Sequence, residues 1–161
     1  MKRGIYFIMV VAVIVGFMAW WFSPVQVLKR RTSGLFDTLT LERDSAPAYR
    51  HLKELAIGSK LADYVTLEAP SIGDVNGRFE RSQLESGFSF LSSNAIESAF
   101  EDEKFVSVTS DGETGTVVVE LTGLVALKEY RPVDGRFHVE LNWKKSDDGW
   151  RLEKASWKEI P

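Results

Sequence analysis

The stretch Arg136–Ile160, RFHVELNWKKSDDGWRLEKASWKEI, carries the pattern that decides the fold. Its first half alternates strictly, and one face carries only apolar residues: Phe137, Val139, Leu141 and Trp143. A period of two residues is typical of a β-strand that buries one face. The segment Asp147-Asp148-Gly149 then predicts a hairpin turn, and Trp150–Ile160 is the second strand. The stretch therefore predicts an antiparallel hairpin.

Two more strands are expected before this hairpin. Phe105–Ser110 and Thr116–Leu127 are rich in β-branched residues, and the segment 111–115, Asp-Gly-Glu-Thr-Gly, separates them as a turn. A further short strand is predicted at Val65–Glu68, where Ala69-Pro70 ends it. Together these segments predict an antiparallel sheet of four strands plus one short strand.

Three helices are expected before the four long strands, because apolar residues recur there at intervals of three and four. The first runs from Pro24 to about Thr40, with Ser23 as its N-cap. The second covers 45–57, and one of its sides is formed by Tyr49, Leu52, Leu55 and Ala56. The third extends from Arg78 to about Ser92. Helices followed by an antiparallel sheet predict an α+β fold in which the helices cover one face of the sheet.

The first 22 residues differ in composition from the rest of the chain. Ile5–Phe22 holds 18 consecutive uncharged residues and ends in aromatic side chains. About 20 apolar residues cross the hydrocarbon core as a helix, and tryptophan is enriched at its edges. We therefore expect a transmembrane signal anchor at 1–22 that contacts the bilayer through residues 5–22, and a soluble domain at 23–161.

Two other interpretations of this segment stay open. One is a cleaved signal peptide, although aromatic residues at 20–22 occupy the place where a cleavage site needs small side chains. The other is a buried core helix. Lys2 and Arg3 favour a cytoplasmic N-terminus, while the basic triplet 29–31 follows closely and competes with them. We expect a single-pass membrane protein with an extracytoplasmic domain.

Composition excludes several classes of function. The chain has 161 residues and no cysteine, which excludes disulfides, thiolate metal ligands and thiol catalysis. Residues 23–161 carry 18 basic and 23 acidic side chains, a net charge of −5. This charge gives no electrostatic footprint for nucleic acid or for anionic lipid. No glycine-rich phosphate motif precedes a helix, and we expect no cofactor.

Candidate catalytic side chains are few. His51 is interpreted as an exposed helix residue, and His138 lies opposite the apolar face of its strand, on the outer side of the sheet. The acidic run 101–103 is interpreted as a solvated connection, because adjacent residues point in different directions. A metal site needs three or four clustered ligands. We therefore predict no catalytic residue and no metal site, and favour a binding protein over an enzyme.

Residues 23–161 resemble the nuclear-transport-factor-2-like domains, also called SnoaL-like or cystatin-like α+β cones. The resemblance rests on the opening helix Ser23–Arg31, the segment Val65–Pro70, and the hairpin Phe137–Leu152 followed by Trp157. It implies a strongly curved sheet wrapped around helices, with a cone-shaped pocket. Members include isomerases, dehydratases, polyketide cyclases, transport adaptors and secretion-system subunits, so the fold by itself selects no function.

Two functions follow from the resemblance and the anchor. The first is a non-catalytic module for protein interaction or assembly at the cell envelope, with an unidentified protein partner and a homodimer through the outer sheet face. The second is a protein that binds a small apolar ligand, or an isomerase- or dehydratase-like enzyme. Its pocket would be lined by Tyr49, Tyr64, Trp143, Trp150 and Trp157. A cone filled by the chain's own side chains favours the first function, and an ionisable group at the base of an open cone favours the second.

Overall fold

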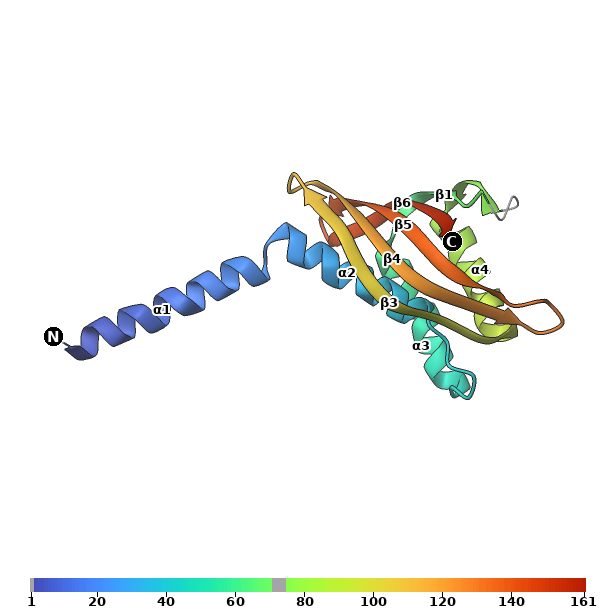
Figure 1. Cartoon of the computed structure of the whole chain (residues 1–161), viewed down its shortest axis with the longest axis horizontal. Coiled ribbons are helices and arrows are strands. Elements are labelled where there is room, and N and C mark those ends of the chain that lie inside the picture. Colours follow the sequence, from blue (N-terminus) through green and yellow to red (C-terminus); the bar gives the residue numbers. More distant parts are fainter. Residues whose placement is uncertain (1, 71–74) are drawn as a thin grey trace.

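Three helices pack on one face of a curved six-stranded sheet, and a fourth helix extends away from them (Figure 1). The structure is a computed structural model that describes residues 2–70 and 75–161, with the side chains of the first helix described at Tyr6 and from Ile8 onward. The helices are α1 (Lys2–Trp21), α2 (Pro24–Leu39), α3 (Pro47–Ile57), the short 3₁₀ helix η1 (Gly58–Lys60) and α4 (Arg81–Asn94). The strands are β1 (Leu61–Glu68), β2 (Gly77–Glu80), β3 (Ala95–Ser110), β4 (Thr114–Leu127), β5 (Val133–Ser146) and β6 (Gly149–Ile160).

The predicted C-terminal hairpin is confirmed. β5 and β6 pair antiparallel from Arg136 opposite Ile160 to Ser146 opposite Gly149. Gly149 has a φ of 121°, a conformation that side chains other than glycine rarely adopt. The apolar face of β5 points toward the helices, because its central members are buried: Val139, Leu141 and Trp143.

The sheet is larger than the sequence predicts, and it is mixed. Its order is β2-β1-β6-β5-β4-β3, with β1 parallel to β6. The expectation of a purely antiparallel sheet was therefore wrong at this edge. β2 lies where the third helix was expected to begin, so α4 starts at Arg81 instead of Arg78, and β1 starts at Leu61 instead of Val65. A parallel pair joins segments that are distant in the chain, so no local turn pattern announces it.

β3 begins at Ala95, well before the predicted start at Phe105. Its register against β4 shifts at three places, and one of them lies between Glu101 and Lys104, where Asp102 has a φ of 56°. Each bulge adds a residue on one strand and interrupts the period of two. The acidic run 101–103 therefore belongs to a bulged strand, and its interpretation as a connection was wrong.

The core lies between α2 and the concave face of the sheet. Leu28 and Phe36 of α2 are fully buried, together with Val117 and Val119 of β4. A Cβ atom at Gly115 would collide with the Leu28 side chain, so glycine permits the close approach of α2 to β4.

The apolar side of α3 is not its packed side. Leu52 is 62% exposed and Leu55 is also exposed, whereas Lys53 is buried. The Lys53 ammonium donates hydrogen bonds of 2.6 Å to the carbonyl oxygens of Asp37 and Thr40, at the C-terminal end of α2. The last carbonyls of a helix lack partners within that helix and carry partial negative charge. The side of α3 that carries Lys53 therefore faces inward, where Lys53 caps the C-terminal end of α2.

α1 extends from the domain as an isolated helix (Figure 1). Within the described side chains, no single helix is long and apolar enough to cross a bilayer, but Ile8–Trp21 and Pro24–Leu39 together meet these criteria with a bend of 54°. Pro24 begins α2 as expected, while the Ser23 side chain forms no cap hydrogen bond. The side chains of residues 2 and 3, on which the predicted orientation rests, lie outside the described set.

Candidate functional site

Aromatic side chains fill the space between the helices and the concave face of the sheet. Trp157 of β6 lies at the centre of this cluster, with ring centroids 6.0 Å from Phe36, 5.8 Å from Phe100 and 6.0 Å from Phe137. All three contacts have an edge-to-face geometry, which is favourable between aromatic rings. The cluster therefore occupies part of the space that the helices and the sheet enclose.

Two small cavities remain on either side of Trp157. The one on the side of β4 and β5 has a volume of about 220 Å³, and its described lining is apolar: Ala69, Val75, Phe100, Gly123, Leu124, Val125, Val133, Phe137 and Trp157. The other, of about 200 Å³, is lined by aliphatic and aromatic side chains of the helices and the sheet. Among the residues that the structure describes, no ionisable side chain lines either cavity. General acid–base catalysis needs such a group within hydrogen-bond reach of the substrate.

The structure does not bring the five predicted pocket residues together. Trp157 lines both interior cavities, whereas Trp143 and Trp150 are buried in the core. Tyr49 is 44% exposed on α3, with its ring centroid 4.9 Å from the Lys53 ammonium. Tyr64 is 48% exposed and lines a different cavity, outside the cone.

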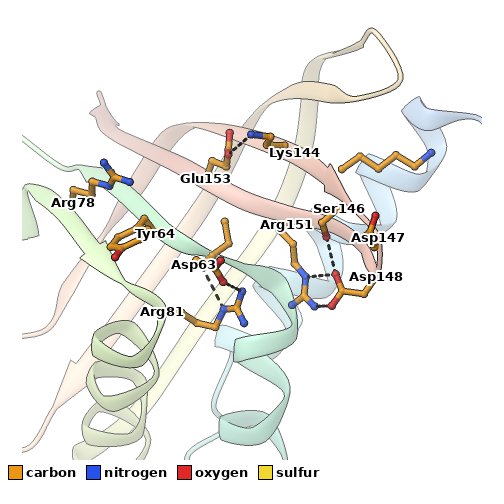
Figure 2. A pocket seen from close by; sticks show the side chains of 12 residues that line it. Asp63, Tyr64, Arg78, Arg81, Lys144, Ser146, Asp147, Asp148, Arg151 and Glu153 are labelled. Carbon is orange, nitrogen blue, oxygen red and sulfur yellow. Dashed lines mark hydrogen bonds and ion pairs between the residues drawn. The ribbon is translucent and has the colours of Figure 1, made fainter.

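That outer cavity is a charged cleft of about 620 Å³, lined by β1, β2, the start of α4 and the β5–β6 hairpin (Figure 2). It forms where the parallel pairing of β1 with β6 is interrupted. Leu61 pairs with Leu152 and Thr66 pairs with Lys154, so four residues of β1 span a stretch that contains one residue of β6. Ala62, Asp63 and Tyr64 of the separated segment line the cleft: the irregular register creates it.

Ion pairs order most of the charged groups in the cleft. Arg81 donates to Asp63 at 2.6 Å, and the Lys144 ammonium lies 3.5 Å from the Glu153 carboxylate. Arg151 pairs with the Asp148 carboxylate.

Three further contacts hold the groups of the cleft in place. Arg151 also donates to the carbonyl oxygen of Gly58 at 3.0 Å. Ser146 donates to Asp148 at 2.7 Å. The Arg78 guanidinium lies 4.4 Å from the centroid of the Tyr64 ring, a cation–π distance.

The Asp148 carboxyl is the most strongly perturbed acid of the cleft. Its hydrogen bond from Arg151, and a second one from Ser146, lower its pKa to about 2. Both donors stabilise the charged form, which fixes the Asp148–Arg151 pair at neutral pH.

The histidines lie outside both the cone and the cleft. The His138 Nδ1 atom is 3.9 Å from the Glu120 carboxylate on the outer face of the sheet, as its place opposite the apolar face predicts. His51 lies on the exposed side of α3, 3.5 Å from the Glu54 carboxylate. No group of three or more metal-ligating side chains occurs among the described residues.

Sequence reasoning singled out Tyr64 but missed the cations of the cleft. Arg78, Arg81 and Arg151 belong to three separate elements, and only the irregular pairing of β1 brings them to one place. A cation near the start of a helix or strand is common in any sequence, so no local pattern marked these three.

Comparisons with known proteins identify the fold. No family model matches the sequence, and no curated protein matches it. Among solved structures, a conserved protein from Planctomyces limnophilus covers 83% of this chain with 95% of its own, at a TM-score of 0.63 and 12% identity.

Two further solved structures are provisionally assigned dehydratases. The one from Streptomyces avermitilis, of the NTF2-like family, covers 85% of this chain with 96% of its own, at a TM-score of 0.61 and 14% identity. The other, from Novosphingobium aromaticivorans, is provisionally assigned as a scytalone dehydratase. Its match covers 84% of this chain and 83% of its own chain, at a TM-score of 0.61 and 8% identity. Identities this low establish the fold alone. The domain therefore has the nuclear-transport-factor-2-like fold, an α+β cone built on a curved mixed sheet.

Proposed function

We propose that this chain is a membrane-anchored, non-catalytic binding module with a nuclear-transport-factor-2-like domain outside the cytoplasm. The observation that carries the proposal is the contrast between an exposed apolar helix and a filled cone. α1 presents apolar side chains on all sides, while the cone interior is occupied by the rings around Trp157.

The exposure of α1 supports the anchor. Its described apolar side chains are about half exposed or more almost throughout, and they include the following: Ile8, Val10, Val13, Ile14, Phe17, Met18 and Trp20. A helix that is apolar all round is stable when buried or inside a membrane, and not in water. α1 extends away from the rest of the structure (Figure 1), so a bilayer is the environment that we propose for it.

The proposed orientation follows from the charges before the span. Lys2 and Arg3 precede it and favour the cytoplasmic side, whereas the triplet 29–31 follows it and competes with them. Two cations of this triplet contact aromatic rings: the Lys29 ammonium lies 5.6 Å from the centroid of the Phe105 ring, and the Arg30 guanidinium lies 4.4 Å from the Trp21 ring. Arg30 also donates to the carbonyl oxygen of Trp21 at 2.8 Å.

Alkaline carbonate extraction of membranes tests the anchor. The full chain should remain in the membrane pellet, and the double variant Val10→Arg/Val13→Arg should move to the supernatant. Two arginines near the centre of a span cost roughly 5–7 kcal/mol on the insertion scale. The matched control is Leu52→Arg/Leu55→Arg on α3, which has the same spacing and similar exposure. If both double variants stay in the pellet, or wild type is released, the anchor is refuted.

A homodimer through the outer sheet face is the partner state that we propose with the anchor. One row across this face places Glu120 between basic side chains, since Lys104, Glu120, His138 and Lys158 lie opposite one another on four neighbouring strands. Charged pairs across an interface are weakened by salt. Light scattering of the full chain in micelles should show a dimer that Glu120→Lys or high salt dissociates. A monomer under all conditions would contradict this state.

A small apolar ligand is the alternative, favoured by the cavity beside Trp157 that Phe100, Val125 and Phe137 also line. Its volume of about 220 Å³ lies below the 300–1,000 Å³ of drug-sized sites, so it suits a very small apolar molecule. Saturable binding of such a molecule, abolished by filling the cavity with Val125→Phe, would favour this alternative. If no binding is detected at any concentration of the small molecule, this alternative is contradicted.

A further inference from the structure

We propose that the charged cleft between β1 and the β5–β6 hairpin binds an extended acidic peptide segment through Arg78, Arg81 and Lys145. This inference rests on the proposed function and names the chemistry of the partner. It concerns a surface outside the cone, so the occupant of the cone does not bear on it.

The charge balance of the cleft is opposite to that of the domain. Five basic side chains line it, against four acidic ones, while residues 23–161 carry a net charge of −5. The three ion pairs described above neutralise three groups of each sign. Within the described residues, Arg78 and Lys145 are left without a carboxylate partner, and Asp147 is the one acid of the cleft without a cation. The cleft therefore offers unmatched positive charge on an acidic domain.

The arrangement of donors favours carboxylates. The Tyr64 ring supports one face of the Arg78 guanidinium, which leaves its N–H edge free to bind. Arg81 uses Nη2 for Asp63 and points Nε toward the carbonyl oxygen of Ala62 at 3.4 Å, so its Nη1 donors stay available. The guanidinium fork of Arg78 can hold a carboxylate by two parallel hydrogen bonds, which are strong because they are charge-assisted, and Nη1 of Arg81 can add a further donor.

The shape of the cleft favours a chain over a single small acid. Arg78 lies at one end of the view in Figure 2, and the β5–β6 turn with Asp147 lies at the other. The volume of about 620 Å³ exceeds what one carboxylate needs. Four residues of an extended peptide span about 13 Å, at roughly 3.3 Å each. The first acidic side chain would meet Arg78 and Arg81, and a later one would meet Lys145.

Fluorescence anisotropy of the full chain in detergent micelles tests the inference. The probe is a labelled peptide of four glutamates with blocked ends, and peptides of four glutamines and four lysines are its controls. We expect saturable binding of the glutamate peptide alone, weakened in high salt because the cations are exposed. Arg78→Gln should weaken binding about tenfold, the effect of losing a charged hydrogen bond, and Lys145→Gln should weaken it less.

The matched control is Arg136→Gln, an exposed arginine on β5 that lies outside the cleft. It removes the same charge from the domain and should leave binding unchanged. Equal losses in Arg78→Gln and Arg136→Gln, or equal binding of glutamate and glutamine peptides, would overturn the inference. Displacement of the peptide by an equal concentration of glutarate or inorganic phosphate would also overturn it, because the site would then take a small anion.

Two readouts separate this inference from the proposed function. Carbonate extraction reports the anchor, and peptide anisotropy reports the cleft. If the chain stays in membranes but no glutamate peptide binds, the cleft inference fails alone. If the peptide binds but the chain is released from membranes, the anchor fails while the cleft inference stands. Circular dichroism of Arg78→Gln should match wild type, since that side chain is exposed.

Discussion

The cone interior and the charged cleft are both concave, but they are built in opposite ways. The interior is closed by aromatic rings that pack edge to face, and the described lining of its remaining cavities is apolar. The cleft lies outside, where β1 departs from β6, and its side chains are charged and open to solvent. Within one fold, then, we propose that the interior supplies stability and that the surface supplies the groups that recognise a partner.

The largest effect is expected in the interior, from Trp157→Ala. Truncation removes the ring that contacts Phe36, Phe100 and Phe137, and it joins the two cavities into one. Large-to-small changes of this kind cost about 3–5 kcal/mol, and the half-buried position favours the lower end. Chemical denaturation of the full chain in micelles measures the change. In the cleft, Tyr64→Ala should cost less than about 1 kcal/mol, because that ring is half exposed. Equal losses at the two sites would remove the distinction between them.

A smaller effect is expected from two cations that differ in burial. Lys53→Met keeps the aliphatic stem of Lys53 but leaves the carbonyl oxygens of Asp37 and Thr40 without this donor. Unsatisfied buried acceptors cost about 1–3 kcal/mol. Arg78→Gln in the cleft should change the free energy of unfolding, measured by chemical denaturation, by less than about 0.5 kcal/mol, because its side chain is exposed. A larger loss in Arg78→Gln than in Lys53→Met would show that the cleft has a structural role.

The smallest effect is a pH dependence at the rim of the cleft. The pKa of Asp148 is about 2 in the folded chain and about 3.9 in an unfolded one, so the folded state favours the charged carboxylate. The ionised Asp148 carboxylate therefore stabilises the folded state fully above about pH 4, and this stabilisation is lost as the pH falls toward 2. Asp148→Asn should therefore lower the thermal midpoint at pH 6 and match wild type near pH 2. Asp147→Asn, its neighbour in the turn, is the control and should show no such convergence.

Local patterns were sufficient for the elements whose partners are adjacent in the chain. The alternation from Phe137 to Trp143 and the turn at Asp147–Gly149 correctly predict the β5–β6 hairpin. The spacing of apolar residues correctly predicts α2 and α3, with ends within a few residues. These signals succeed because both period and turn chemistry are set by neighbours in sequence.

Features that depend on distant partners could not be predicted. The start of β3 is hidden by bulges, one of them at Asp102, where the alternation of side chains is lost. The exposed side of α3 is apolar because Lys53 caps another helix, a contact that periodicity does not contain. The cleft likewise depends on how β1 pairs with β6. Of the five pocket residues expected from the resemblance, Trp157 lines both interior cavities and Tyr64 lines the cleft, among the residues that the structure describes.

The most direct test of an anchored domain outside the cytoplasm uses the absence of cysteine from the chain. A single cysteine can be placed at Val13 in α1 or at the exposed Ser107 of β3 without a competing thiol. A membrane-impermeant maleimide is then added to right-side-out membrane vesicles. We predict that Ser107→Cys is labelled and that Val13→Cys reacts only after the membrane is dissolved. Labelling of Val13→Cys in intact vesicles, or protection of Ser107→Cys until the vesicles are opened, would contradict the proposal.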